Sequence, residues 1–201
     1  MARPAKFSHD QILDAARAAV VRHGRAATIA HVADEIEVPV GSIYHRFASR
    51  EELFVTLWLR AVRRFQAGVL AAAADGDPGA ALAACAVHVS RYCREHPDEA
   101  LALTLYRHRA LVRSGPPALA DQVRPLNDDV LALMADLTRR RYGRVGPHLL
   151  DLGRTAAQQC PYGLVRPYVG GEVPAWLDGA VRAAAVAILA LGDTPEAGSV
   201  P

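Results

Sequence analysis

Residues 28–54, TIAHVADEIEVPVGSIYHRFASREELF, decide the fold of this chain. Thr28 is placed as a helix N-cap, and Pro39 removes a backbone donor from the middle of the stretch. A first short helix should therefore end near Glu37, and a second should cover residues 41–47. The stretch predicts two short helices that meet at a tight turn.

The second of these helices has one apolar face and one polar face. Ile43 and Phe47 are four residues apart and therefore point inward together. The outer face then carries hydroxyl, phenol, imidazole and guanidinium groups, on Ser42, Tyr44, His45 and Arg46. Such groups can reach phosphates and base edges from a short, rigid helix, so this is the composition of a recognition helix.

Capping signals place a further helix on each side of this pair. A Ser-x-x-Gln box at residues 8–11 begins a helix that Gly24 ends. A Ser-x-x-Glu box at residues 49–52 begins a long helix, which the Asp-Gly-Asp-Pro-Gly sequence of residues 75–79 interrupts. Two short helices thus lie between two longer ones.

The rest of the chain has helical periodicity and no strand-like alternation. We therefore predict an all-α protein of about nine helices, in which a long helix joins an N-terminal three-helix helix-turn-helix domain to a C-terminal helical domain. The helices expected in the C-terminal part cover residues 80–96, 98–113, 118–142, 147–169 and 174–191.

Composition shifts suggest where these parts begin and end. The helix-turn-helix domain should cover residues 1–54, with the linking helix running to about residue 74. The second domain should cover residues 75–192. The Pro-, Gly- and Ser-rich residues 193–201 are predicted to be a disordered tail. The basic residues at the N-terminus fit either a solvated tail or an arm that enters a minor groove.

Bulk composition leaves the function open. The formal net charge of +2 permits nucleic-acid binding but does not demand it. Three cysteines without a closely spaced framework fit reduced thiols. The N-terminus lacks the apolar region of a signal peptide, and no apolar run approaches the length of a membrane span. We therefore expect a soluble, cytoplasmic protein with no membrane partner.

The spaced pattern of Thr28-Ile29, residues 41–47 and residues 49–54 resembles the TetR family of bacterial transcriptional regulators. The resemblance implies an N-terminal helix-turn-helix and a C-terminal ligand-binding and dimerisation domain. Glu37 stands where the family usually has glycine, and Pro39 stands where it usually has a capping serine. The DNA contacts that the resemblance implies are Thr28, Ser42, Tyr44, His45, Arg46 and Arg50.

Other chemistry has weaker support in the sequence. Cys85, His88, Cys93 and His96 share one face of a predicted helix, but the first and last lie about 16 Å apart along its axis, too far to bind one zinc ion. Cys160 is formally a nucleophile, yet no nucleophile motif surrounds it. We therefore expect no metal, no other cofactor and no catalytic residue.

The second domain offers material for a ligand pocket and for a dimer interface. Aromatic and polar-tipped groups among Ala and Leu suit a mostly apolar pocket. The pocket candidates are His88, Tyr92, Tyr106, His108, Cys160, Tyr162 and Trp176. The last two helices should pack against a second copy, and the interface candidates are Leu164, Val181, Ala184 and Ile188.

These observations favour a homodimeric DNA-binding regulator. We expect a repressor that binds a palindromic double-stranded operator and leaves it when a small apolar or amphipathic effector binds. The alternative is a helical small-molecule carrier or enzyme whose N-terminal module is only structural. Binding to DNA that weakens steeply with salt would discriminate between the two.

Overall fold

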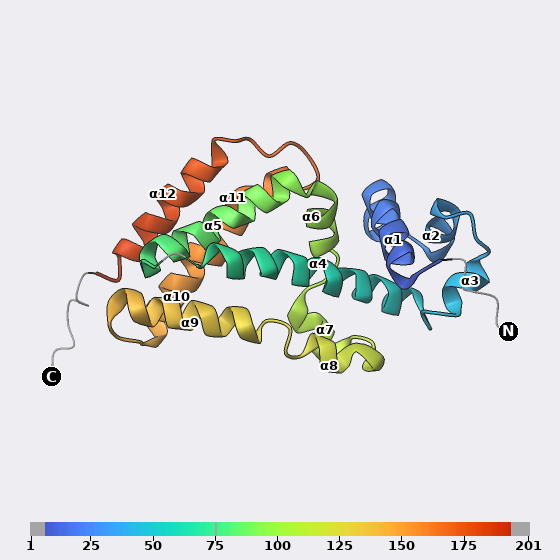
Figure 1. Ribbon diagram of the computed structural model, residues 1–201, viewed down its shortest axis with the longest axis horizontal. Coiled ribbons are helices and arrows are strands. Elements are labelled where there is room, and N and C mark those ends of the chain that lie inside the picture. The colour runs from blue at the N-terminus through green and yellow to red at the C-terminus, as the bar shows by residue number, and fades with distance from the viewer. Residues whose placement is uncertain (1–6, 75, 194–201) are drawn as a thin grey trace. The chain divides into compact units, whose positions relative to one another are not determined.

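A computed structural model of the protein describes residues 7–74 and 76–193. Every regular element in these residues is helical, and they contain no β-strand (Figure 1). The all-α prediction is therefore confirmed. The predicted basic arm, residues 1–6, lies outside the described residues, as does the predicted tail except for Asp193.

The chain packs as two compact units. The first, here called the head unit, comprises Met1–Arg64 and Pro97–Leu126. The second, here called the body unit, comprises Phe65–His96 and Asn127–Pro201. Packing therefore assigns residues 97–126 to the unit that contains the predicted helix-turn-helix. The division by role, into residues 1–54 and 75–192, stays a prediction.

The head unit begins with the helices that the capping signals predicted. Helix α1 covers His9–His23, and the Ser8 box is present, with Oγ accepting from Gln11 N–H at 3.1 Å. Helix α2 covers Ile29–Glu35 and helix α3 covers Val40–Tyr44. A 3₁₀ turn, Gly24–Ala26, links α1 to α2. The two short helices of the opening stretch are therefore both formed.

The turn between α2 and α3 uses glutamate in a backbone conformation that favours glycine. Glu37 has φ of +51°, and no other non-glycine residue among those described has a positive φ. Val38 N–H donates to Ala33 O at 3.0 Å, and Glu37 N–H donates to Asp34 O at 3.3 Å. This pair of bonds is a Schellman motif, in which the residue after the helix adopts the left-handed conformation. Glu37 is therefore strained, because residues other than glycine rarely adopt this conformation.

One hydrophobic core fills the head unit. Helix α4, Arg50–Ala72, contributes Phe54 and Trp58, which pack with Phe47 and with residues of α1 and α2. The same core includes side chains from helices α6 (Pro97–Leu103), α7 (His108–Ser114) and α8 (Ala120–Val123) and from the 3₁₀ turn Pro117–Leu119. These side chains are Ala102, Leu111, Leu119 and Val123, and Leu105, which follows α6, is buried in the same core.

Two helices predicted as continuous are in fact broken. The prediction of one helix over residues 98–113 is wrong, because Thr104 and Leu105 donate to the carbonyls three residues before them and end α6. Leu105 then turns into the head core. The prediction of one helix over residues 118–142 is also wrong, because Pro125 has no N–H with which to continue α8.

The body unit is built around α5, Pro78–Glu95, which packs against α9 and α12. Asp178 on α12 links that helix to α5 by accepting from Ser90 Oγ at 2.6 Å and from Arg91 and Arg94. A π-helical turn precedes Pro161, which cannot donate to the helical ladder. The remaining elements are α9 (Asp128–Tyr142), α10 (Pro147–Arg154), the π turn (Thr155–Gln159), α11 (Cys160–Val165), a 3₁₀ turn (Arg166–Tyr168) and α12 (Leu177–Ala190).

No helix among the described residues is both long enough and apolar enough to cross a membrane.

Replacing Glu37 with glycine should stabilise the protein. The substitution relieves the left-handed strain on an L-residue, which exceeds the added backbone entropy of glycine, so the free energy of unfolding should rise by about 0.5–1 kcal/mol. Urea denaturation measures this change. The matched control is Asp34→Gly within α2, which should lower stability by a similar amount. A loss of stability in Glu37→Gly would contradict the strain assigned to this turn.

Candidate nucleic-acid interface

The predicted contact residues of α3 are exposed while its inward face is sealed. Ile43 and Phe47 are buried in the head core. Tyr44 is 50% exposed, although an aromatic side chain of this size is usually largely buried, and Ser42 and His45 are exposed beside it. The α3 segment is therefore anchored by its buried side and exposes a phenol, a hydroxyl and an imidazole to solvent.

Thr28 starts α2 with a capping box that contains an unusual partner. Thr28 Oγ1 accepts from His31 N–H at 3.2 Å, and Thr28 N–H donates to His31 Nδ1 at 3.3 Å. His31 thus occupies the place that Glu or Gln has in an ordinary capping box. Its ring stacks on that of His23, with centroids 3.8 Å apart. Because Nδ1 accepts, the hydrogen of the neutral His31 ring lies on Nε2.

Arg50 binds the segment that leads into α2. Its Nε donates to Ala27 O and one terminal nitrogen donates to Arg25 O, both at 2.8 Å. Its guanidinium also lies 4.8 Å from the centre of the Phe54 ring. Sequence reasoning proposed Arg50 as a phosphate contact and missed this tie, which depends on two backbone carbonyls more than twenty residues away. Arg50 holds the start of α2 in place.

Arg46 is set apart from the other predicted contacts on α3. It is half-buried and lines an open groove of about 420 Å³ together with His9, Phe47, Glu52 and Arg60. The ring of His9 lies 4.8 Å from that of Phe47. The structure therefore places Arg46 between α1 and α4, whereas Ser42, Tyr44 and His45 are exposed to solvent.

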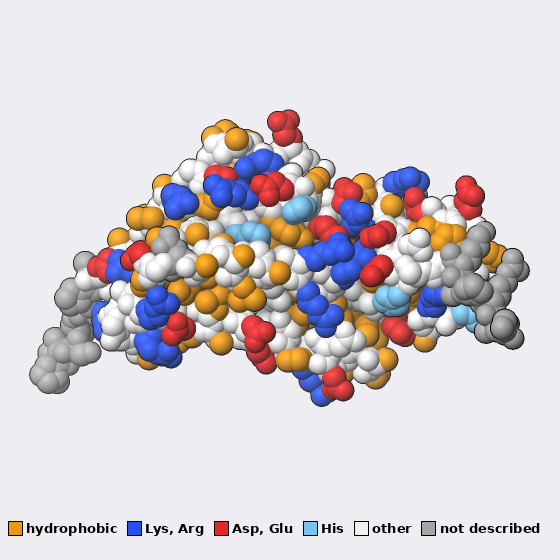
Figure 2. All heavy atoms as spheres, viewed as in Figure 1, with side chains coloured by type: hydrophobic (Ala, Val, Ile, Leu, Met, Phe, Trp, Pro, Cys, Tyr) orange, Lys and Arg blue, Asp and Glu red, His pale blue; other side chains and the backbone are white. Residues whose placement is uncertain are grey.

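Charge is dispersed on the face of the protein drawn in Figure 2. Basic and acidic side chains alternate there and do not form one broad basic patch. This agrees with the small formal net charge of +2. On this face, the charges therefore provide no general positive surface for an anionic polymer.

The residues predicted to line a ligand pocket are divided between the two units. Tyr106 and His108 belong to the head unit, where His108 Nε2 lies 2.7 Å from Val123 O and burial raises the pKa of Tyr106. Cys160 is half-buried in the body unit. Tyr162 and Trp176, also in the body unit, are largely exposed.

His88 and Tyr92 do form a cluster within the body unit. Their rings pack with that of Phe65, whose centroid lies 5.0 Å from His88 and 5.2 Å from Tyr92. His88 Nε2 lies 3.1 Å from Phe65 O, and burial lowers the pKa of His88. Gly68 leaves the space that the His88 ring occupies, since a Cβ there would overlap it. Phe65, His88 and Tyr92 therefore form one packed aromatic cluster in the body unit.

The cysteines of the body unit have the properties of core residues. Cys85 and Cys93 are buried, and burial raises the pKa of each thiol to about 11. Such thiols are protonated at neutral pH and unreactive. No group of three or more potential metal ligands occurs in residues 7–74 and 76–193.

The dimer-interface candidates differ in exposure. Val181 is only 1% exposed, so its side chain packs within its own body unit. Leu164, Ala184 and Ile188 are half-buried. The large apolar side chains that are truly exposed in this region are ones that sequence periodicity did not select: Tyr162, Trp176, Val186 and Leu191.

Comparison with known proteins bears on the head unit first. Residues 12–57 match the family described as bacterial regulatory proteins, tetR family. The matched segment contains the capping box of α2, the Glu37 turn, α3 and Arg50. The N-terminal domain is that of the TetR family. A comparison with the curated proteins found no match.

Solved structures extend the likeness of the TetR-type fold to nearly the whole chain. A transcriptional regulator from Rhodococcus sp. Rha1 is 19% identical, with a TM-score of 0.73 over 94% of this chain and 100% of that one. The TetR-family regulator PfmR from Thermus thermophilus is 21% identical, with a TM-score of 0.69 over 89% and 97%. The ketosteroid transcriptional regulator KstR2 of Mycobacterium tuberculosis is 18% identical, with a TM-score of 0.68 over 92% and 94%. The chain thus has the fold of a TetR-family transcriptional regulator.

Arg50→Lys should destabilise the head unit although it preserves the charge. A lysine ammonium cannot donate to both carbonyls in the fork geometry of arginine or lie flat on Phe54, so the free energy of unfolding should fall by about 1–2 kcal/mol. Urea denaturation provides the measurement. Arg46→Lys, which breaks no side-chain hydrogen bond among the residues that the structure describes, should stay within about 0.5 kcal/mol of the wild type. Equal stability of the two variants would rule out the structural role of Arg50.

Proposed function

We propose that the protein is a homodimeric transcriptional repressor that binds a palindromic operator and releases it when a small apolar or amphipathic effector binds. The observation that carries the proposal is the exposure of Tyr44, Ser42 and His45 on a helix whose opposite face is completely buried. A TetR-type domain with such a helix is suited to insert it into a major groove. The DNA contacts proposed are Thr28, Ser42, Tyr44, His45 and Arg50, with Arg46 at the margin.

Within this set the roles differ by chemistry. Thr28 and Arg50 lie at helix starts, where side chains and backbone donors suit phosphate oxygens and so position the domain. Tyr44 and Ser42 can donate to phosphates or to base edges, and His45 can do either through its ring nitrogens. We expect Arg50 to contact phosphate through the donors that its carbonyl bonds leave available.

Dimerisation is proposed to use the outer side of α11 and α12. Val186 is 54% exposed on α12, and Tyr162, Trp176 and Leu191 expose further apolar surface in the same unit. Alanines and a glycine occupy most other exposed positions of α12, so a second helix could approach closely. A second copy of the chain would bury this surface, and two heads would then meet two half-sites of a palindrome.

The proposed effector is apolar or amphipathic because the aromatic cluster of the body unit offers few polar groups. Phe65, Tyr92 and His88 form an aromatic cluster in which the His88 and Tyr92 tips are the polar groups, and such a lining suits a ligand with few hydrogen-bonding groups. The name of KstR2, a ketosteroid regulator of the same fold, is consistent with a ligand of this kind. Release follows if the effector binds more tightly to a form of the dimer that does not fit the operator.

Tyr44→Ala should weaken DNA binding without unfolding the protein. We expect a ten- to hundredfold loss, about the value of a hydrogen bond to a charged phosphate, because the side chain is exposed and bears no core contact. Fluorescence anisotropy with a labelled duplex from the DNA that flanks its own gene measures the loss at fixed salt. Tyr44→Phe separates the hydroxyl from the ring.

The wild-type affinity for the same duplex should also fall about 10³- to 10⁵-fold between 50 and 200 mM salt, if 6–10 phosphates are contacted. Unchanged affinity of Tyr44→Ala at fixed salt would remove Tyr44 from the DNA site. A salt-independent affinity would argue against DNA binding altogether and for a carrier.

Val186→Glu should convert the dimer into monomers. A buried, unpaired carboxylate at each copy of the interface is costly, whereas Val186 is already exposed within one chain, so the fold should survive. Sedimentation velocity gives the mass, and circular dichroism checks the fold. Val112→Glu on α7, another exposed valine, is the matched control and should remain a dimer. A dimeric Val186→Glu protein would place the interface elsewhere.

A further inference from the structure

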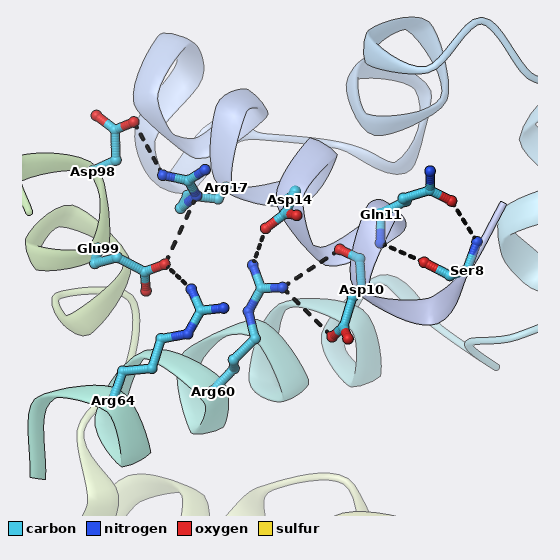
Figure 3. A network of polar contacts seen from close by, with 9 residues as sticks. All are labelled: Ser8, Asp10, Gln11, Asp14, Arg17, Arg60, Arg64, Asp98 and Glu99. Carbon is cyan, nitrogen blue, oxygen red and sulfur yellow. Dashed lines mark hydrogen bonds and ion pairs between the residues drawn. The ribbon is translucent and has the colours of Figure 1, made fainter. Parts of the chain in front are cut away.

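A buried carboxylate connects three helices of the head unit. Glu99 on α6 is only 6% exposed, and its Oε1 binds Arg64 of α4 and lies 3.8 Å from Arg17 Nε of α1. Arg17 also binds Asp98, with 3.3 Å between Nη1 and Oδ2. Figure 3 shows both arginines converging on Glu99 from different helices. We call Arg17, Arg64, Asp98 and Glu99 the Glu99 clamp.

A second contact in the same view holds α1 to α4 independently of the clamp. Arg60 of α4 is 12% exposed and binds Asp14 at 2.8 Å and Asp10 at 3.7 Å, both on α1 (Figure 3). The Arg60 contact does not reach α6, whereas the Glu99 clamp connects α6 to both α1 and α4. Without Glu99, α1 and α4 would stay joined, but α6 would lose its ionic link to α4 and keep only the more exposed Asp98–Arg17 pair to α1.

The clamp lies where the chain leaves and re-enters the head unit. Arg64 is the last residue of the first head segment, and Glu99 is the third residue of the second segment, Pro97–Leu126. Their contact therefore closes the head unit across the excursion that the chain makes through the body unit. Arg17 then fixes this closure to α1, the helix that supports α2.

Apolar and neutral contacts continue the attachment along residues 97–126. Trp58 Nε1 donates to Leu103 O at 3.2 Å, and Arg63 donates to Gln122 Oε1 at 3.0 Å. Leu105 and Val123 are buried in the core that also holds Phe47. The segment is thus packed as part of the DNA-binding unit along its length.

Burial of the charge decides which of these contacts is most sensitive to substitution. Exposed ion pairs contribute little, because water and salt screen them. Glu99 is buried, and its Oε2 has no hydrogen-bond partner among the described residues, so its charge depends on the two arginines. Removing one member of such a set leaves uncompensated charge in a dry site, which is strongly unfavourable.

We propose that Glu99 is a positioning residue that couples residues 97–126 to the proposed DNA-binding helices, so that both parts of the head unit open and close as one cooperative unit. DNA bound to α2 and α3 then also slows local opening of α6–α8, although these helices are not themselves proposed DNA contacts. This second part rests on the proposed function, whereas the cohesion of the free head unit does not.

Hydrogen exchange followed by mass spectrometry tests the proposal on the full chain. In the DNA-free protein, Glu99→Gln should raise amide exchange in both α1 and residues 97–126, by about tenfold as expected for a strongly coupled buried pair, and leave α9–α12 unchanged. Arg17→Gln should reproduce that pattern. Asp98→Asn, which alters the more exposed carboxylate, should change the rates less than about twofold.

The DNA-bound arm uses a duplex from the DNA that flanks its own gene. In the wild type, DNA should slow exchange in residues 97–126 as well as in α1–α3. In Glu99→Gln, at saturating DNA, protection should be confined to residues 9–54. Faster exchange limited to α6 in the free variant, or equal DNA-dependent protection of residues 97–126 in variant and wild type, would overturn the proposal.

The two arms separate the proposals from each other. Absence of DNA binding by the wild type would defeat the proposed function, while the pattern in the DNA-free protein would still decide whether the clamp unifies the head unit.

Discussion

A helix of five residues cannot keep its shape in water by itself, and α3 is such a helix. Pro39 at its start offers no side-chain cap, so local hydrogen bonds supply little of what it needs. The burial of Ile43 within α3 and Phe47 just after it supplies the rest, at about 1.5–3 kcal/mol for each side chain. The orientation of Tyr44 follows from this burial, because a helix held by one face must present the other. The part of the proposed DNA-binding surface that α3 supplies depends on that constraint.

Charged side chains then fix the relative positions of the head-unit helices, which apolar packing alone specifies only loosely. Arg50 holds the segment before α2 through two carbonyls and the Phe54 ring. Glu99 draws α1 and α4 onto α6 in the same unit. Both are charges whose partners lie far away in the sequence. Apolar packing gives the head unit its cohesion, and these few directional contacts give it a single arrangement.

Local signals made much of this fold predictable from the sequence. Ser8, Thr28 and Gly24 gave the limits of α1 and the start of α2, because caps act within one turn. The strain at Glu37 was also foreseeable, since a Schellman turn requires a left-handed residue there. The breaks after α6 and α8 were not predicted: α6 ends where Leu105 becomes buried in the head core, which is a tertiary effect, and α8 ends at Pro125, which has no N–H to donate. The pocket candidates were chosen by chemistry alone, and no local pattern tells that Tyr106 packs in one unit and Tyr92 in the other.

The central claim is that two copies of the protein read a palindrome through α3. Repeated selection of the wild-type protein on a pool of random duplexes, followed by sequencing, tests it without requiring a known operator sequence. The result we predict is an inverted repeat whose half-sites lie about 10–10.5 base pairs apart, centre to centre, or a multiple of that distance, with two chains bound to each duplex. Enrichment of no sequence over the starting pool, or of a single half-site bound by one chain, would contradict the account.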